Sequence, residues 1–166
     1  MNNTKFYIQI KIRVSSGNFD LGKEVEIVFD SHVFNAKLLE NMAPKTCEII
    51  FNSLPIDSDN SMDGGAVHSA WSGEVIMVRW DFKKLPLRIP PENKTIYARE
   101  GVVACHDMNA PLNEIYIVYR YGYFHYWLGP NPYNEFAKIT DNLDELAEVG
   151  RRIQLEGRKK FIMRKK

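Results

Sequence analysis

The stretch from Ala66 to Arg79, AVHSAWSGEVIMVR, gathers residue types that small-molecule sites use. It places His68 three residues before Trp71 and six residues before the carboxylate of Glu74. An imidazole titrates near neutral pH, so His68 can exchange a proton with a substrate while a nearby carboxylate orients the ring. The stretch therefore predicts acid–base chemistry on a small molecule. A structural reading stays open, in which His68 bonds a loop carbonyl and Glu74 is solvated.

A second carboxylate is the stronger candidate as partner of His68. Glu114 opens the otherwise apolar run Ile115–Tyr119. A carboxylate at the mouth of a barrel strand can face a pocket and have a perturbed pKa. We therefore predict His68 and Glu114 as the catalytic residues, with Glu74 as the second choice of partner.

Other polar and aromatic residues are predicted to contact the ligand. Trp71 can stack on a planar ligand or simply seal the end of a barrel. Tyrosines can donate hydrogen bonds into a pocket, although packing is their commoner role, and His106 follows a predicted buried strand. The predicted ligand-binding residues are Trp71, Glu74, Tyr97, His106 and Tyr119.

No motif in the sequence indicates a metal or a cofactor. The histidines lack the H-x-H and H-E-x-x-H spacings of metal sites, and Ser72-Gly73 lacks the Gly-x-Ser-x-Gly surroundings of a nucleophile. We therefore predict no metal ligands and no cofactor, so any catalysis would rely on side chains alone.

Length and charge fit one globular domain, residues 1–166. The 22 basic and 21 acidic residues nearly cancel, which gives no electrostatic case for a nucleic-acid partner. The basic end, RKKFIMRKK, is interpreted as the solvated face of a last strand.

Two cysteines and the absence of apolar spans suggest where the protein works. Cys47 and Cys105 lie in apolar runs and are predicted to be reduced core residues of a cytoplasmic protein. The sequence has no signal core and no apolar run long enough to cross a bilayer, so no membrane partner is expected.

Alternating apolar residues predict about eight short strands, because side chains of a strand point to opposite faces in turn. The clearest is Lys5–Val14, where every second residue is apolar. The others are Glu24–Phe29, Val33–Leu39, Glu74–Trp80, Gly101–Cys105, Glu114–Tyr119, Glu135–Ile139 and Arg158–Arg164.

Two helices are expected. Ala43–Leu54 has Pro44 in its first turn and apolar residues at helical spacing. The second helix starts at Asn142, which with Glu145 can form a capping box, and Gly157 ends it. On its solvent side Glu148 and Arg152 are spaced to pair.

Two connections stand out. The acidic, glycine-ended stretch Ile56–Gly65 is predicted to be a loop long enough to act as a lid, or an ordinary surface loop. Lys83–Asn93 contains three prolines and is expected to be an extended connection. Since the helices do not alternate with the strands, the pattern predicts a mainly β fold: a closed or nearly closed barrel with two helices capping its ends.

Aromatic residues crowd the segment Tyr121–Tyr133, YGYFHYWLGPNPY. They can fold over a pocket or form a contact between subunits, where Tyr and Trp are enriched. We favour the second interpretation and predict a homo-oligomer that associates through this segment.

The helix start Ala43-Pro44-Lys45-Thr46 after a strand is similar to the start of a cyclophilin. More closely, the chain resembles a bacterial and archaeal family of unknown function with a cyclophilin-like fold. The matching segments are APKTCEIIFNSLP (43–55), AVHSAWSGEV (66–75), NEIYIVYRYG (113–122) and NLDELAEVGRRIQLEG (142–157). The resemblance implies the fold but no reaction.

The chain departs from true cyclophilins at their catalytic motifs. The region that would carry Phe-His-Arg and Gln-x-Gly-Gly-Asp reads HSAWSGEVIMVRW, and Arg79 comes several residues too late to replace the catalytic arginine. Prolyl isomerisation is therefore the least supported function. The preferred one is binding of a small carboxylate- or amide-containing metabolite, with acid–base catalysis as an option, and the alternative is a non-catalytic scaffold.

Overall fold

A computed structural model describes residues 22–58, 64–79, 88–107, 113–126 and 128–166. The predicted strand Lys5–Val14 and residues 83–87 of the predicted extended connection lie outside these ranges. Within them, two helices and thirteen strands are formed.

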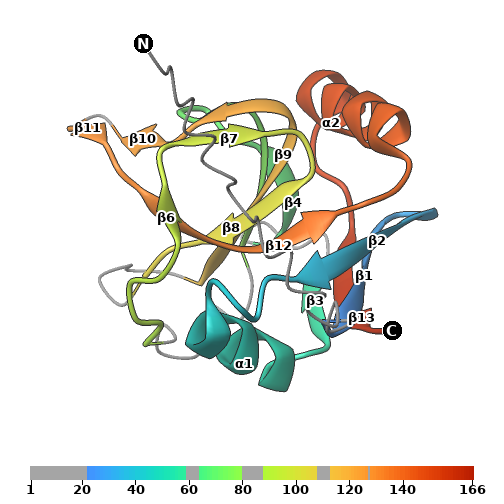
Figure 1. Cartoon of the computed structure of the whole chain (residues 1–166). Helices are drawn as coiled ribbons and strands as arrows, with labels where there is room; N and C mark the ends of the chain where they lie inside the picture. The colour runs from blue at the N-terminus through green and yellow to red at the C-terminus, as the bar shows by residue number, and fades with distance from the viewer. Residues whose placement is uncertain (1–21, 59–63, 80–87, 108–112, 127) are drawn as a thin grey trace, which may run out of the picture.

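Nine strands form a nearly closed antiparallel barrel (Figure 1). The first and last strands of the sheet do not pair with each other. Instead, backbone hydrogen bonds join Ala66 and Lys159 across the gap, at 2.9 and 3.0 Å. In sheet order the strands are β3 (Ile56–Ser58), β13 (Phe161–Lys165), β1 (Glu24–Phe29), β2 (His32–Leu38), β12 (Tyr133–Ile139), β8 (Val102–Cys105), β9 (Glu114–Tyr123), β5 (Gly73–Arg79) and β4 (Gly65–His68).

Four short strands extend this sheet or lie beside it. Strand β6 (Lys94–Thr95) pairs with β12, and β7 (Tyr97–Arg99) pairs with the far end of β9. The hairpin of β10 (His125–Tyr126) and β11 (Gly129–Pro130) forms a separate two-stranded sheet. The nearly closed barrel with two helices confirms the predicted fold class.

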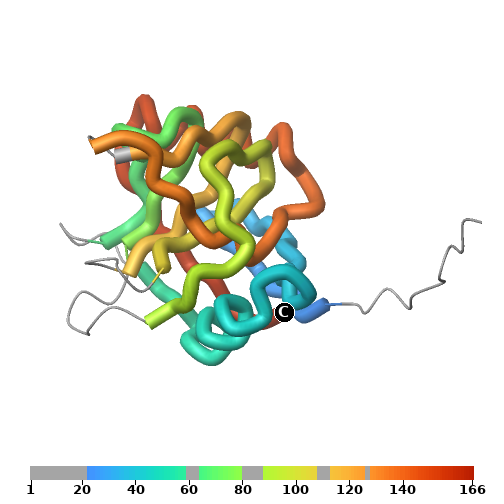
Figure 2. The backbone as a smooth tube through the Cα atoms, turned by 60° about the vertical axis from the view of Figure 1, so that its left-hand side comes forward, coloured from blue at the N-terminus to red at the C-terminus, as the bar shows by residue number. Residues whose placement is uncertain are grey.

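Helix α1 (Pro44–Asn52) lies below the barrel in Figure 1, and α2 (Leu143–Glu156) lies at its upper right. Figure 2 shows α1 again at the lower end of the molecule. Both helices pack on the barrel interior, where Cys47 and Ile50 of α1 and Leu146 and Ile153 of α2 are buried. Apolar burial of this kind is the main stabilising force between helix and sheet.

Helix α1, Pro44–Asn52, lies within the predicted range Ala43–Leu54, and a distant carboxylate caps its start. The backbone N–H and the hydroxyl of Thr46 both donate to Glu92 Oε2 at 2.8 Å. Asn134, which is fully buried, accepts a bond from the Glu92 N–H and donates one to Pro90 O. Glu92 therefore fastens residues 88–93 to the start of the helix.

The capping box predicted for α2 is wrong. Asn142 adopts a left-handed backbone (φ 50°) and makes no side-chain cap bond. Glu145 instead accepts a hydrogen bond from His32 Nδ1 at 2.7 Å, which joins the helix to the start of β2. A contact across the fold has replaced the local one.

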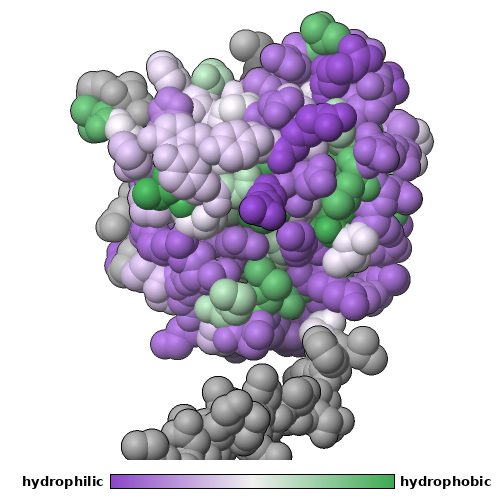
Figure 3. Space-filling view, turned by 45° about the horizontal axis from the view of Figure 1, so that its top comes forward, coloured by the Kyte–Doolittle hydropathy of each residue, from purple (hydrophilic) through white to green (hydrophobic). Residues whose placement is uncertain are grey.

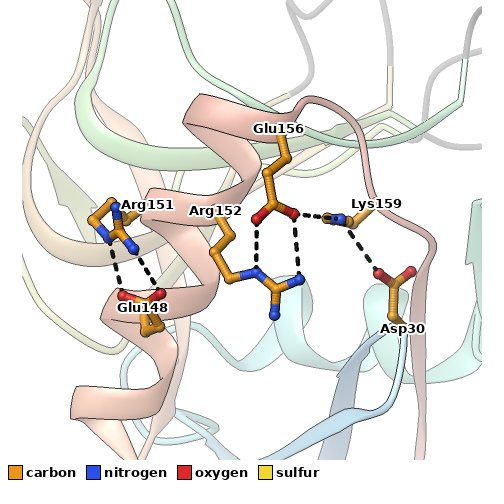
Figure 4. Close-up of polar contacts among 6 residues, drawn as sticks. All are labelled: Asp30, Glu148, Arg151, Arg152, Glu156 and Lys159. Atoms are coloured by element: carbon orange, nitrogen blue, oxygen red, sulfur yellow. Dashed lines mark hydrogen bonds and ion pairs between the residues drawn. The ribbon is translucent and has the colours of Figure 1, made fainter.

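The predicted Glu148–Arg152 pair is wrong as well. Arg151 Nη2 lies 2.8 Å from Glu148 Oε1, and Arg152 Nε lies 3.1 Å from Glu156 Oε1 (Figure 4). Glu148 and Glu156 are each one helical turn from Arg152, and Arg152 pairs with Glu156, on the C-terminal side.

Lys159 extends these pairs to the neighbouring strands. Its Nζ lies 3.0 Å from Glu156 and 4.0 Å from Asp30, as Figure 4 shows. Arg164 on β13 pairs with Glu26, and Lys166, directly after that strand, pairs with Glu24. This agrees with the interpretation of the basic end as an ordinary strand face.

Two local predictions need correction. Ile56–Ser58, placed in a loop by the sequence, forms β3 and pairs with β13, and Gly65–His68 forms β4. The aromatic segment is not wholly exposed, because β9 continues to Tyr123, while Phe124 and Tyr133 are buried. Both buried rings pack on the outer side of β8 and β9. None of the helices in the described residues is long and apolar enough to cross a membrane.

Candidate functional site

Strand register places His68 and Glu114 on opposite faces of the sheet. His68 lies opposite Ile76, which lies opposite Ile117, whereas Glu114 lies opposite Arg79. Directly opposed residues share a face, and residues three apart on one strand do not. Because Ile76 and Arg79 are three apart, the predicted pairing of His68 with Glu114 is wrong. The site residues predicted from the sequence belong to separate clusters.

The first cluster surrounds Glu114, whose side chain is only 2% exposed. Arg79 Nε donates to Glu114 Oε1 at 2.7 Å, and Tyr116 Oη donates to Oε2 at 2.5 Å. His106 Nε2 lies 3.3 Å from the same Oε2. We call Arg79, His106, Glu114, Tyr116 and Tyr133 the Glu114 cluster.

These residues meet because four neighbouring strands end at one edge of the barrel. Arg79 is the last residue of β5 and Glu114 is the first of β9. His106 directly follows β8, and Tyr133 is the first residue of β12. The strands are antiparallel in the order β12-β8-β9-β5, so these ends adjoin.

Hydrogen bonding keeps Glu114 ionised. Burial by itself would raise the pKa of the carboxyl, but hydrogen bonds from His106, Tyr116 and Arg79 outweigh it and lower the pKa to about 2. Such a carboxylate is a poor proton acceptor at neutral pH. It acts as a fixed negative charge that orients the groups around it. Burial, together with the charge of Glu114, raises the pKa of Tyr116, which therefore stays a hydrogen-bond donor.

Two tyrosine rings enclose the imidazole of His106. The ring centre of His106 lies 4.3 Å from that of Tyr133 and 5.4 Å from that of Tyr116. His106 Nε2 also lies 3.1 Å from Tyr116 Oη. The imidazole is thereby held in one orientation beside the carboxylate.

Arg79 is the part of the cluster that solvent reaches, with 41% of its side chain exposed. A guanidinium has five N–H donors, and the bond from Nε to Glu114 uses one of them. Terminal nitrogens of an arginine match the geometry of a carboxylate. The arrangement can therefore present a fixed cation to a planar anion.

The second cluster joins His68 to Tyr119. His68 Nε2 and Tyr119 Oη are 3.1 Å apart. Burial lowers the pKa of His68, partly opposed by the charge of Glu74, and burial together with that charge raises the pKa of Tyr119. His68 is therefore a neutral imidazole near pH 7, bonded to a neutral phenol.

Helix α2 covers this second cluster. A Cβ added to Gly150 would lie 2.2 Å from Cγ of Tyr119, so the ring rests directly on the backbone of the helix. Tyr119 is almost completely buried, and His68 is partly buried. This contact indicates that His68 and Tyr119 pack against helix α2, whether or not they also take part in chemistry.

The remaining predicted ligand residues lie on the surface. Trp71, in the turn between β4 and β5, is exposed, and so is Tyr97 on β7. Tyr97 makes ring contacts with Tyr121 and Tyr123. Whether these residues bind a ligand stays a prediction.

The sequence pointed to Tyr116 only as one of several tyrosines that can donate hydrogen bonds into a pocket, and to Tyr133 only as part of the aromatic segment; it gave Arg79 no role in the candidate site. Arg79 was judged only by its distance from a cyclophilin motif. Arg79 lies near the end of the predicted strand Glu74–Trp80 and Glu114 begins another, but only the observed pairing of β5 with β9 shows that these two charges adjoin. Among the described residues, no group of three or more His, Cys, Asp or Glu side chains is placed to hold a metal ion.

Residues 25–164 match the family described as "Protein of unknown function (DUF3830)". The chain belongs to this family. The matched range contains both clusters and both helices, and it covers nearly all of the barrel described above. A comparison with curated proteins finds no match.

Solved structures share the fold of this DUF3830 member. McbB, solved in complex with tryptophan, is 16% identical with a TM-score of 0.65. The alignment covers 86% of this chain but 44% of McbB, so the chain spans less than half of that protein.

Two other structures match over nearly their full length. A hypothetical protein from Archaeoglobus fulgidus is 17% identical with a TM-score of 0.54, covering 90% of this chain and 99% of that one. A cyclophilin type peptidyl-prolyl cis-trans isomerase from Cryptosporidium parvum is 14% identical with a TM-score of 0.51, covering 86% and 94%. These likenesses confirm the cyclophilin-like fold.

Proposed function

We propose that the protein binds a small carboxylate- or amide-bearing molecule at the Glu114 cluster, with Arg79 as its anchor. One observation carries the proposal: a carboxylate that is 2% exposed is held ionised against a guanidinium that is 41% exposed. The cation is thus fixed from inside the fold while part of it faces solvent.

The energetic cost of this arrangement argues for a role beyond stability. Removing a carboxylate from water costs several kcal/mol, and apolar residues of similar size often stabilise a fold at least as well as a buried ion pair. A buried, strongly perturbed carboxylate beside a histidine and an arginine is the kind of group that functional sites contain. Ligand binding would use the preorganised charge.

His106 is the residue through which the site could also catalyse a reaction. Glu114 and Tyr116 lie within 3.3 Å and 3.1 Å of its Nε2 and hold the ring in place. In this proposal the acid–base role predicted for His68 belongs to His106, and Glu114 is its positioning residue. No cofactor takes part in such a proton transfer.

The comparison with McbB supports the proposal at the level of the fold. McbB was solved in complex with tryptophan, a small molecule with a carboxylate. A cyclophilin-like barrel can therefore accompany the binding of such a molecule. The alternative is a binding scaffold without turnover, in which the Glu114 cluster holds its ligand and His106 only packs.

A thermal-shift screen of small carboxylates, amides and cyclic ureides tests this function. The wild-type protein should be stabilised by a subset of carboxylates, because a bound ligand adds to the free energy of unfolding. The Arg79→Lys variant keeps the charge but loses the planar fork, and should lose most of that shift.

The matched control is Arg151→Lys, an exposed arginine on α2 that pairs with Glu148. It should respond to the ligands as wild type does. The proposal fails if no carboxylate stabilises the wild type, or if Arg79→Lys responds as fully as the control.

A further inference from the structure

Three tyrosines and an arginine share one exposed face at the end of β9 that lies away from Glu114. Tyr97 lies opposite Tyr123, and Arg99 opposite Tyr121, so these side chains leave the same face of the sheet. Tyr97 is 65% exposed and Tyr121 is 51% exposed. In Figure 3 a group of pale aromatic rings lies side by side on the surface. We call Tyr97, Arg99, Tyr121 and Tyr123 the tyrosine face.

The rings of this face contact one another. Tyr97 stacks on Tyr123 with ring centres 5.0 Å apart and planes at 26°, and it lies 6.5 Å from Tyr121. The stack covers one face of Tyr97 at most, and Tyr121 is tilted rather than stacked, so much of both rings faces solvent. Exposed tyrosines beside an arginine are typical of protein–protein interfaces, where both residue types are enriched.

Exposed charges of both signs lie around the tyrosine face. Arg99 is exposed, and so is Glu74, whose neighbour Gly73 lies opposite Gly122, between Tyr121 and Tyr123. Within the described ranges neither Arg99 nor Glu74 has an ion-pair partner. A partner must therefore supply both charges, which a polyanion does not.

We infer that the tyrosine face binds a second copy of the same chain in a two-fold dimer. In such a dimer each surface patch meets its own copy, so Arg99 of one protomer faces Glu74 of the other, and the reverse contact forms at the same time. The stacked tyrosines form the apolar centre of the contact. The sequence prediction of association through Tyr121–Tyr133 is thereby narrowed to Tyr121 and Tyr123, joined by Tyr97 from β7.

This inference does not depend on the proposed ligand site. Glu114 begins β9 and Tyr123 ends it, so the two surfaces lie at opposite ends of the strand. Variants of the tyrosine face leave Arg79 and His106 untouched, and the two proposals can fail separately.

Sedimentation velocity of the full chain over a concentration series tests the dimer. The wild-type protein should sediment as a dimer that dissociates on dilution. Tyr97→Ala/Tyr121→Ala should weaken dimerisation by at least about tenfold, because truncated aromatic anchors dominate interface energies. Leu155→Ala, at another exposed apolar residue on α2, is the control and should dimerise as wild type does. A wild-type chain that stays monomeric to about 100 µM overturns the inference, as does a double variant that dimerises normally.

A charge exchange tests the identity of the partner. Arg99→Glu places two like charges at each contact and should prevent dimerisation, and so should Glu74→Arg. The double variant Arg99→Glu/Glu74→Arg restores both contacts and should dimerise again. Single variants that dimerise like wild type, or a double variant that stays monomeric, contradict the predicted contact.

Discussion

Arg79 Nε lies 2.7 Å from Glu114 Oε1, at the point where β5 ends and β9 begins. The carboxylate is buried and the guanidinium is partly exposed to solvent, so this ion pair links a buried charge to a charge that a ligand can reach. A cation fixed in this way pays little conformational entropy when it binds an anion. The pair therefore serves both the local fold and the proposed site.

Replacing Glu114 by Gln should change how stability depends on pH. The folded-state pKa is about 2, below the ordinary 4.5, so the unfolded chain takes up the proton first as the pH falls. Glu114 thus contributes stability that is complete above about pH 4.5 and is lost as the pH falls towards 2, amounting to about 3 kcal/mol. Urea unfolding at a series of pH values should show a smaller loss for Glu114→Gln than for wild type in that window.

The control for this measurement is Glu100→Gln, at an exposed carboxylate. It should follow the wild-type pH profile. If Glu114→Gln also follows the wild-type profile down to pH 2, the buried ion pair does not have the strength that its geometry indicates.

Replacing Gly150 by Ala should destabilise the protein, although Gly→Ala in a helix normally stabilises it by about 1 kcal/mol. The added Cβ would overlap the Tyr119 ring at 2.2 Å, and overpacking of this kind costs about 1–3 kcal/mol. Chemical denaturation measures the sign directly. Gln154→Ala, on the exposed side of the same helix, should be neutral or slightly stabilising, and a stabilised Gly150→Ala would refute the close packing of α2 on Tyr119.

Replacing Glu92 by Ala should lower the stability of the fold through helix α1. Glu92 accepts bonds from the N–H and hydroxyl of Thr46, so Glu92→Ala leaves the start of α1 without its cap and should cost about 1–2 kcal/mol. Thermal unfolding of Glu92→Ala and of Glu48→Ala, an exposed carboxylate within α1, separates capping from charge. Equal melting temperatures for the two variants would mean that Glu92 does not cap the helix.

The fold was predictable where a pattern is local. Alternation defined β1 and β13, and Pro44 and Gly157 marked helix ends correctly, because each signal depends only on neighbouring residues. The very short strands β6 and β7 were missed, since two or three residues cannot show a period. The cap of α2 failed for another reason: His32, far away in sequence, binds Glu145 in place of the helix start.

The site was predictable in its residue types but not in its grouping. Glu114 was predicted as a catalytic residue and His106 as a ligand-binding residue, and the structure brings these two side chains together. His68 was paired with the wrong carboxylate, because the face on which a strand residue lies depends on register with other strands, which one sequence does not reveal. Arg79 became meaningful only once β5 and β9 were seen side by side.

The most direct test of the account compares an acid with its amide. For a carboxylate ligand found by screening, calorimetry should give dissociation constants for the acid and its primary amide, with the wild type and with Arg79→Gln. The wild type should prefer the acid by about tenfold or more, since charge-assisted bonds to a carboxylate are the stronger ones. Arg79→Gln should bind both alike. If the variant keeps the full preference for the acid, Arg79 is not the anchor and the proposed site is wrong.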